Sequence, residues 1–507
     1  MKLNVMKNAK RNMMFGLANK LALVLCPFAV RTVMQLVLGA QYLGLNSLFS
    51  SILSILSLTE LGFGSAVVYH MYRPIAQNDI ETVNALLYFY KRVYRGIGIL
   101  ILAAGALWIP FLPYFIHGDY PEEVNLTVLY LIYLINASIS YFMYAYKSSL
   151  LVAYQREDGN SIANLLITVL LNGSQIAALF VFRNYVLFLL LTPVFTIANN
   201  LLIACMVKKM FPQYHCKGTL PACLAQDIRQ RVQGAFLSKL CMVSRNAFDS
   251  IVASMFLGLT VTAMYNNYYY VMHGVNVMLS VIPASFLGGV GNHVAVKSVE
   301  ENFIELKKLD FLYMWISGWC TVCFVCLFQP FMQWWMGEEM MLPEPVMILF
   351  CLYFYLLSAG DMRSVYSSAN GLWWQHRRRS VAEAAANLIL NFILGRFFGI
   401  YGILTATILT IFVCNFVWGV RIVFKHYFQL FRLKEYYGCH IKYALATCVL
   451  CILTYNVCAW LPCGQVMGGL LLRALVCVVL PNIGYALIYG RTDMFWQVRQ
   501  MVWRKRL

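Results

Sequence analysis

Three basic side chains lie within long apolar stretches of the sequence, namely Arg31, Lys239 and Arg245. An ionised side chain at the centre of a bilayer costs on the order of 2.5–3.5 kcal/mol, so it persists where it faces a cavity or a partner. Arg forks match phosphate oxygens bidentately, and Lys supplies a point charge. These residues are therefore predicted to bind an anion. Ion pairing is an open alternative, because Arg31 has Glu60 on the next segment and Arg245 has Asp249 four residues later.

The acidic residues in apolar stretches are Glu60, Asp249 and Asp361, and Arg363 follows the last of them closely. Acids inside membrane segments commonly take a proton or help to bind a sodium ion. We therefore predict a role for these four residues in coupling to an H⁺ or Na⁺ gradient or in charge pairing. Charge pairing is favoured, because each acid has a basic residue near it in sequence or on a neighbouring segment.

No cofactor, metal site or catalytic residue is predicted. Cys320, Cys323 and Cys326 form two overlapping C-x-x-C spacings, and Cys448 and Cys451 form another, but no His or carboxylate cluster accompanies them. A cysteine in an apolar stretch usually acts as a small hydrophobe. The phosphate-binding motif G-x-x-x-x-G-K-[ST] does not occur in the sequence, so binding of ATP by such a loop is not expected.

Composition places the elements that carry these residues in a membrane. The 507 residues are 61% hydrophobic and 12% charged, and the mean hydropathy is +0.67. About 20 apolar residues cross a bilayer core as a helix. The sequence predicts an all-α polytopic protein of about fourteen such helices. Their ranges are 13–38, 45–72, 91–116, 124–153, 161–182, 184–208, 233–257, 261–294, 309–336, 344–370, 381–399, 401–424, 439–462 and 466–489.

The formal net charge of +18 is concentrated in alternate loops, a pattern that orients membrane helices. Basic loops cover 73–95, 208–231, 297–308, 377–379 and 425–434, whereas 117–123 and 337–343 carry mainly acidic charge. Both termini are therefore expected in the cytoplasm. Because topology accounts for most of the positive charge, no nucleic-acid partner is expected.

Two pairs of similar short sequence runs suggest an internal repeat. The run at 42–45, YLGL, resembles FLGL at 256–259, and YQ at 154–155 followed by ANL at 163–165 resembles WQ at 374–375 followed by ANL at 386–388. We predict a six-helix lobe at 1–210, a cytoplasmic linker with an amphipathic helix at 211–232, and a second six-helix lobe at 233–425. Two accessory helices and a basic tail follow at 426–507. A parallel repeat of this kind favours two lobes around a central cavity and alternating access.

The stretch 31–49 together with SLTELGFGSA at 57–66 resembles the polysaccharide biosynthesis or O-antigen flippase family. That family belongs to the multidrug/oligosaccharidyl-lipid/polysaccharide exporter superfamily. The resemblance implies two six-helix bundles in a V around a cationic cavity. It also implies export of an undecaprenyl-pyrophosphate-linked oligosaccharide across the bacterial cytoplasmic membrane, with Arg31, Lys239 and Arg245 facing the pyrophosphate.

The sequence thus predicts a transporter rather than an enzyme, with a lipid-linked oligosaccharide and the bilayer as partners. A polysaccharide polymerase and glycosyltransferases are candidate further partners. An ion-coupled multidrug exporter or a lipid II flippase of the same fold is the alternative function. A membrane glycosyltransferase or polymerase ranks lower, because the acidic outer loops are short and offer no platform for acid-base chemistry.

Overall fold

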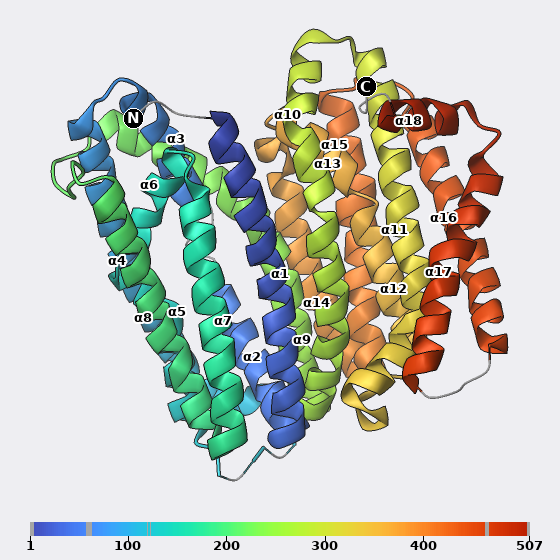
Figure 1. The fold of residues 1–507 in the computed structure, drawn as a ribbon, viewed down its shortest axis with the longest axis horizontal. Helices are drawn as coiled ribbons and strands as arrows, with labels where there is room; N and C mark the ends of the chain where they lie inside the picture. The colour runs from blue at the N-terminus through green and yellow to red at the C-terminus, as the bar shows by residue number, and fades with distance from the viewer. Residues whose placement is uncertain (1–4, 57–62, 119, 122, 462–465, 504–507) are drawn as a thin grey trace. The chain divides into compact units, whose positions relative to one another are not determined.

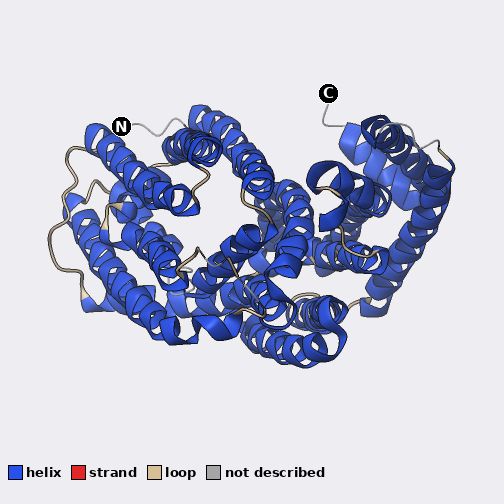
Figure 2. Cartoon of the chain, turned by 90° about the horizontal axis from the view of Figure 1, so that it is seen from below, coloured by secondary structure: helices blue, strands red, loops and turns tan. Residues whose placement is uncertain are grey.

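The computed structural model describes residues 5–56, 63–118, 120–121, 123–461 and 466–503. These residues form helices joined by short loops, and no strand occurs among them (Figure 2). By compactness the chain divides into one unit at Met1–Ala263 and a second at Met264–Leu507. We describe each unit by itself. The predicted lobe boundaries stay a prediction.

The helices of the first unit are, in chain order, α1 (Val5–Val37), α2 (Ala40–Leu56), α3 (Phe63–Ala76), α4 (Ile80–Trp108), η2 (Ile109–Phe115), α5 (Leu126–Phe142), η3 (Ala145–Lys147), α6 (Ser148–Ala153), α7 (Glu157–Phe182), α8 (Tyr185–Met210) and most of α9 (Ala222–Leu279). Helix α1 packs along α7, and α4 and α8 pack on α5. The amphipathic helix predicted in the linker 211–232 continues into the following span, because α9 starts at Ala222 and has no break before Gly258.

The second unit holds the end of α9 and then α10 (Val281–Val296), α11 (Val299–Met336), η4 (Glu338–Met340), α12 (Glu344–Ser358), α13 (Asp361–Ala369), α14 (Trp373–Thr410), η5 (Ile411–Trp418), α15 (Gly419–His426), α16 (Leu433–Trp460), α17 (Val466–Tyr489) and α18 (Asp493–Trp503). Helices α16 and α17 both pack on α11, and α18 crosses their end (Figure 1).

Side chains fix several helix starts. Asp79 accepts a hydrogen bond from the Thr82 amide at the start of α4, at 3.0 Å. Ser298 and Glu301 form a reciprocal capping box at the start of α11. These contacts satisfy amide groups that have no partner within the helix.

Two glycines break long helices. Gly258 interrupts α9 with φ 83° and ψ 176°, and Gly399 interrupts α14 with φ 58° and ψ −134°. Glycine reaches positive φ without steric strain, so these breaks need no other residue type. The carbonyl oxygen of Ser254, one turn before Gly258, accepts a hydrogen bond from the His117 amide at 2.9 Å.

The predicted fold class is confirmed. Ten described helices are long and apolar enough to cross a membrane, or eleven if the bent pair Leu126–Phe142 and Ala145–Ala153 is one span. Two of the ten contain the breaks at Gly258 and Gly399, so each comprises two of the predicted segments. Every predicted helix overlaps a helix of the described chain, although the segment 45–72 includes residues outside it.

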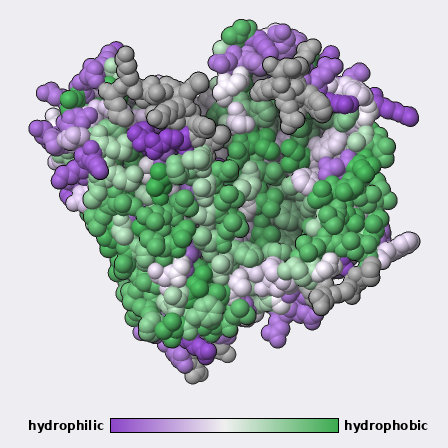
Figure 3. All heavy atoms as spheres, in the orientation of Figure 1, coloured by the Kyte–Doolittle hydropathy of each residue, from purple (hydrophilic) through white to green (hydrophobic). Residues whose placement is uncertain are grey.

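The surface pattern fits a lipid environment. On the face drawn in Figure 3, hydrophobic residues cover the middle of the helices and hydrophilic residues gather at the helix ends. Large apolar side chains stand exposed along the accessory helices, such as Leu445 at 62%, Leu471 at 61% and Leu487 at 76%. Contiguous exposed apolar surface of this kind indicates contact with lipid.

Candidate functional site

In the first unit, the predicted residues lie on two helices. Arg31 is partly exposed on α1, while Arg245 and Asp249 are buried on α9, with exposed fractions of 7% and 0%. A separation of four residues places Arg245 and Asp249 on the same helix face. Glu60 lies outside the described residues, and so does the side chain of Lys239. The anion-binding role of the basic residues stays a prediction.

In the second unit, Asp361 and Arg363 begin α13 at a break in the span that starts with α12. The Tyr313 hydroxyl, on α11, donates a hydrogen bond to the Asp361 carboxylate at 2.5 Å. The Arg363 guanidinium turns elsewhere, toward η5. These two charged residues therefore have separate partners, although they are two positions apart in sequence.

Arg363 is held by neutral oxygens. Its guanidinium donates to the backbone oxygen and the side-chain oxygen of Asn415, each at 3.0 Å, and to the Gly360 carbonyl at 3.4 Å. In the part of the chain that the structure describes, every hydrogen bond of Arg363 goes to an amide oxygen. Its exposed fraction is only 4%. A buried guanidinium with no carboxylate partner is costly and often marks a functional position.

The sequence creates room for this guanidinium in two ways. Asn415 lies in η5, a π-helix whose wider turn is often found at functional sites. Gly419 follows directly after η5, and a Cβ atom at that position would overlap the guanidinium nitrogen of Arg363. A Cβ atom at Gly360 would lie 2.9 Å from the same guanidinium group. Arg363 therefore fills a space that two glycines leave open.

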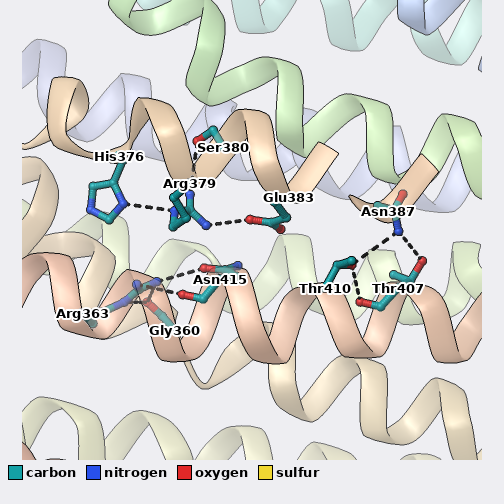
Figure 4. A network of polar contacts seen from close by, with 10 residues as sticks. All are labelled: Gly360, Arg363, His376, Arg379, Ser380, Glu383, Asn387, Thr407, Thr410 and Asn415. Atoms are coloured by element: carbon teal, nitrogen blue, oxygen red, sulfur yellow. Dashed lines mark hydrogen bonds and ion pairs between the residues drawn. The ribbon is translucent and has the colours of Figure 1, made fainter. Parts of the chain in front are cut away.

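A second row of polar side chains on α14 faces this site (Figure 4). Arg379 donates to the Glu383 carboxylate at 2.7 Å and to the His376 ring at 3.1 Å. Farther along, Asn387 donates to the Thr407 hydroxyl at 3.0 Å, across the break at Gly399. Glu383 is 1% exposed and Arg379 is 14% exposed, so a buried carboxylate pairs with a partly buried guanidinium.

Three polar contacts, two with a buried carboxylate and one partly exposed, were missed from the sequence. They are the Arg379–Glu383 pair, the Asp310–His440 pair at 2.9 Å and the Lys307–Glu435 pair at 2.5 Å. The last two join α11 to α16. The spacing of four residues between Arg379 and Glu383 was available as a signal. The α11–α16 pairs carried no sequence signal, because their partners are about 130 positions apart.

A clip of polar groups ties α1 to α7 in the first unit. Asp158 is 1% exposed and pairs with Arg11 and Arg156, at 2.9 Å in each case. Asn12 adds two hydrogen bonds, because its side chain accepts from the Asp158 amide and donates to the Gln155 carbonyl. This Asp158 clip neutralises a buried carboxylate with two cations.

Two hollows adjoin the accessory helices of the second unit. An apolar groove of about 370 Å³ lies between the end of α9, α11 and α17. Its lining contains no charged or amide side chain; it is made by Val271, Val275, Cys320, Cys323, Phe324, Leu327, Phe328, Phe331, Leu470, Leu471 and Ala474. A polar cavity of about 330 Å³ lies between α11, α12, α16 and α17, and Glu344 and Arg473 are its charged residues.

Neither a family model nor a curated protein sequence matches this chain. Solved structures do match. The lipid II flippase MurJ, in an inward closed conformation, has a TM-score of 0.67 at 15% identity, over 94% of this chain and 99% of that chain. An inward-facing multidrug resistance MATE family transporter of the MOP superfamily has a TM-score of 0.59 at 16% identity, over 82% of this chain and 96% of that chain.

This chain has the same fold as these solved transporters. A MOP superfamily transporter from Pyrococcus furiosus also matches, with a TM-score of 0.55 at 16% identity, over 82% of this chain and 96% of that chain. At such identities the likeness shows the fold alone. It confirms the predicted fold of a multi-pass membrane protein, whereas the superfamily and the narrower O-antigen flippase assignment stay predictions.

Proposed function

We propose that this protein is a flippase for an undecaprenyl-pyrophosphate-linked oligosaccharide. It would move an O-antigen, capsule or exopolysaccharide repeat unit from the cytoplasmic to the outer leaflet of the bacterial inner membrane, by alternating access. Both termini would lie in the cytoplasm. A polysaccharide polymerase and glycosyltransferases would act beside it as partners.

The apolar groove between α9, α11 and α17 is the observation that carries this proposal. A long isoprenoid tail must stay among apolar groups while its charged headgroup crosses the membrane. Bulk lipid is as apolar as the groove, so the hydrophobic effect contributes little free energy when the lipid tail moves from the bilayer into the groove. It offers shape instead, since Phe324, Phe328 and Phe331 form a fixed wall on α11. A groove of this composition suits a hydrocarbon chain.

The extent of the structural likeness also supports a lipid-linked substrate. MurJ covers 94% of this chain, whereas the MATE transporter covers 82% while being itself 96% covered. This chain thus has about the length of the lipid II flippase and exceeds that of the multidrug transporter. The accessory helix α17 supplies one wall of the groove.

Cationic side chains would bind the pyrophosphate in this proposal. Arg31, Lys239 and Arg245 are the assigned residues, with the guanidinium groups forming bidentate contacts. Energy would come from an H⁺ or Na⁺ gradient, with Glu60 and Asp249 as further charged groups. No cofactor is needed for this work.

An ion-coupled multidrug exporter is the second candidate. The MATE likeness favours it, and so does Asp361, an acidic side chain in a candidate span that accepts a hydrogen bond from Tyr313. A lipid II flippase of the same fold is a third candidate. Its substrate would differ from the proposed one in the sugar and peptide that the lipid carries.

A reconstituted transport assay tests the proposal. Purified protein in liposomes receives fluorescent undecaprenyl-pyrophosphate-oligosaccharide, and a membrane-impermeant quencher reports the label that reaches the far leaflet. We expect translocation well above that of protein-free vesicles. Translocation equal to that of lipid alone, together with gradient-driven export of a cationic dye, would favour the multidrug exporter instead.

Arg245 gives the sharpest mutational test. We expect Arg245→Ala to reduce translocation at least about tenfold, because a bidentate phosphate contact is worth more than 1.4 kcal/mol. Arg432→Ala is the control, since that arginine is 57% exposed. If Arg245 only neutralises Asp249, the double variant Arg245→Ala/Asp249→Ala should recover activity. Recovery would contradict the anion-binding role.

A further inference from the structure

A cluster of three cysteines lies where α11, α16 and α17 meet. Cys326, Cys458 and Cys477 come from these three helices, and their Sγ atoms all lie within 4.8 Å of one another. All three are buried, with exposed fractions of 4%, 3% and 0%. The sequence suggested C-x-x-C pairs along one helix. The structure instead brings together thiols that are up to about 150 positions apart.

Neighbouring contacts hold the three helices in register around this thiol cluster. The Trp319 indole on α11 donates to the backbone oxygen of Cys477 at 2.8 Å, and the Trp315 indole donates to the Asn482 side chain at 2.9 Å. On the other side, the hydroxyls of Thr447 and Tyr485 join α16 to α17 at 2.7 Å. The cluster is therefore positioned by bonds that do not involve its own sulfur atoms, as a preorganised site requires.

We propose that Cys326, Cys458 and Cys477 bind one Cu(I) ion. Soft thiolate ligands favour Cu(I), Zn²⁺ and iron–sulfur clusters, and iron–sulfur clusters are usually held by four cysteines. Structural Zn²⁺ sites are almost always four-coordinate, and three thiols are in mutual reach here among the described residues. Metal–sulfur bonds of about 2.3 Å place three ligands about 4 Å apart, so each sulfur atom moves by less than about 1 Å.

Charge and access support a metal ion at this position. Arg473 lies one turn before Cys477 on α17, and it lines the polar cavity together with Cys326 and Cys458. The three thiols lose three protons and hold one Cu⁺, which leaves a group of charge −2. A nearby guanidinium favours thiolates and offsets part of that charge. The same cavity gives the ion a polar route, because Glu344 also lines it.

Binding would have a structural consequence. Cys320 and Cys323 line the apolar groove, while Cys326 lines the polar cavity on the same helix. An ion at the thiol cluster would fix α17 and α16 against α11 and so set the width of the groove. This metal site goes beyond the proposed transport function. The test of copper binding is independent of the test of transport.

A copper titration of the purified full-length protein tests the site. Cu(I) is added under nitrogen in competition with a chromogenic chelator, and bound copper is counted per chain. We expect the wild type to bind one equivalent more than the variant Cys326→Ala/Cys458→Ala/Cys477→Ala. The matched control Cys351→Ala/Cys414→Ala/Cys439→Ala, in the same unit, should keep that equivalent. X-ray absorption should show copper bound to sulfur only.

Other outcomes would overturn the proposal. Equal copper content in the wild type and the cluster variant would do so, and so would copper loss in the control variant alone. The single change Cys458→Ser retains a residue of similar size and provides a second test if the triple variant does not fold. Formation of a disulfide in the cluster, with no Cu(I) retained by the reduced protein, would also refute it.

Discussion

At the scale of residues, the second unit binds two guanidinium groups in different ways, one buried at Arg363 and one partly buried at Arg379. Arg379 has a carboxylate partner in Glu383, so its charge is compensated directly. Arg363 relies on amide oxygens of Asn415 and Gly360. Breaking a buried ion pair by removing one partner commonly costs about 3–5 kcal/mol. The amide-bound arginine depends instead on shape, because its hydrogen bonds require the space beside Gly419.

Gly419→Ala tests this dependence on shape. The added Cβ would overlap the Arg363 guanidinium, which must then leave Asn415 or shift the backbone. Overpacking of this kind typically costs about 1–3 kcal/mol, so we expect a lower melting temperature in detergent. Gly438→Ala on α16 is the control, because nothing lies within 4 Å of a Cβ there. An unchanged melting temperature for Gly419→Ala would mean that the pocket is loose.

The types of the candidate residues could be predicted from sequence, but most of their partners could not. Asp361 and Arg363 stood out as charged residues in an apolar stretch. Their partners Tyr313 and Asn415 are about 50 positions away. Both carry uncharged side chains, so a search for charged residues in apolar stretches does not find them. Only tertiary packing brings such groups together, and hydrophobic periodicity does not report it.

At the scale of elements, glycine decides where two long helices break. The sequence predicted one boundary between 257 and 261 and another at 399, and the breaks occur at Gly258 and Gly399. The predicted helix 381–399 starts at residue 381, whereas α14 begins at Trp373. The basic run was interpreted as a loop. In the structure these residues belong to α14, and the Arg377 guanidinium lies over the Trp374 ring at 3.7 Å.

The predicted repeat matches two asparagines that each form a hydrogen bond to another helical segment. Asn164 and Asn387 are matched by the predicted repeat. Asn164 on α7 accepts from Asn199 on α8 at 2.9 Å, and Asn387 on α14 donates to Thr407 beyond the break at Gly399. Each asparagine therefore joins its helix to the next one along the chain. Interhelical amide bonds of this kind stabilise membrane helix pairs by about 0.6 kcal/mol on average.

Gly258→Ala should destabilise the first unit. An L-residue is strained at φ 83°, and its Cβ would lie 2.9 Å from the His117 carbonyl oxygen. Strain of this type costs on the order of 1–3 kcal/mol. Thermal unfolding in detergent measures the effect. Gly288→Ala on α10 meets nothing within 4 Å and should be neutral or slightly stabilising. Equal melting temperatures for the two variants would contradict the argument.

The start of α4 should depend on pH. Hydrogen bonds from the Thr82 hydroxyl and amide hold the pKa of the Asp79 carboxyl below its ordinary value. A depressed carboxyl pKa means that capping is complete above about pH 4 and is lost as the pH falls through the native pKa. Thr82 amide exchange, corrected for intrinsic rates, should quicken at low pH. The Asn125 cap of α5 does not titrate, so the Val128 amide should not change. Matching behaviour of the two amides would contradict this prediction.

At the scale of the whole molecule, composition alone predicted a membrane protein of many helices. Apolar stretches have a period and a length that a single sequence displays, so the fourteen segments could be located. The grooves and cavities could not be located from the sequence, because they form where three or four helices pack with space between them. The similarity to solved transporters is a similarity in the arrangement of helices, because the sequence identity is only 15–16%.

Removal of the chain after Phe431 should unfold much of the second unit. It deletes α16, α17 and α18, so Asp310 loses His440 and Lys307 loses Glu435. Asp310 is 2% exposed, and a buried carboxylate left without its partner is strongly destabilising, whereas the Lys307–Glu435 pair is partly exposed and contributes less. We expect loss of the monodisperse peak in size-exclusion chromatography. Removal after Arg491 deletes only α18 and should have a small effect. A stable chain ending at Phe431 would show that the accessory helices are dispensable for folding.

The Asp158 clip has a consequence for how the chain is made. Helix α1 ends at Val37 and its packing partner α7 begins at Glu157. At about 5–20 residues per second, the ribosome needs on the order of 10 s to synthesise the intervening segment. During that time the first helix sits in the bilayer without its lateral partner. Late arrival of α7 therefore sets the earliest moment at which Arg11 and Asn12 can bind Asp158 and fix the N-terminal end of the chain.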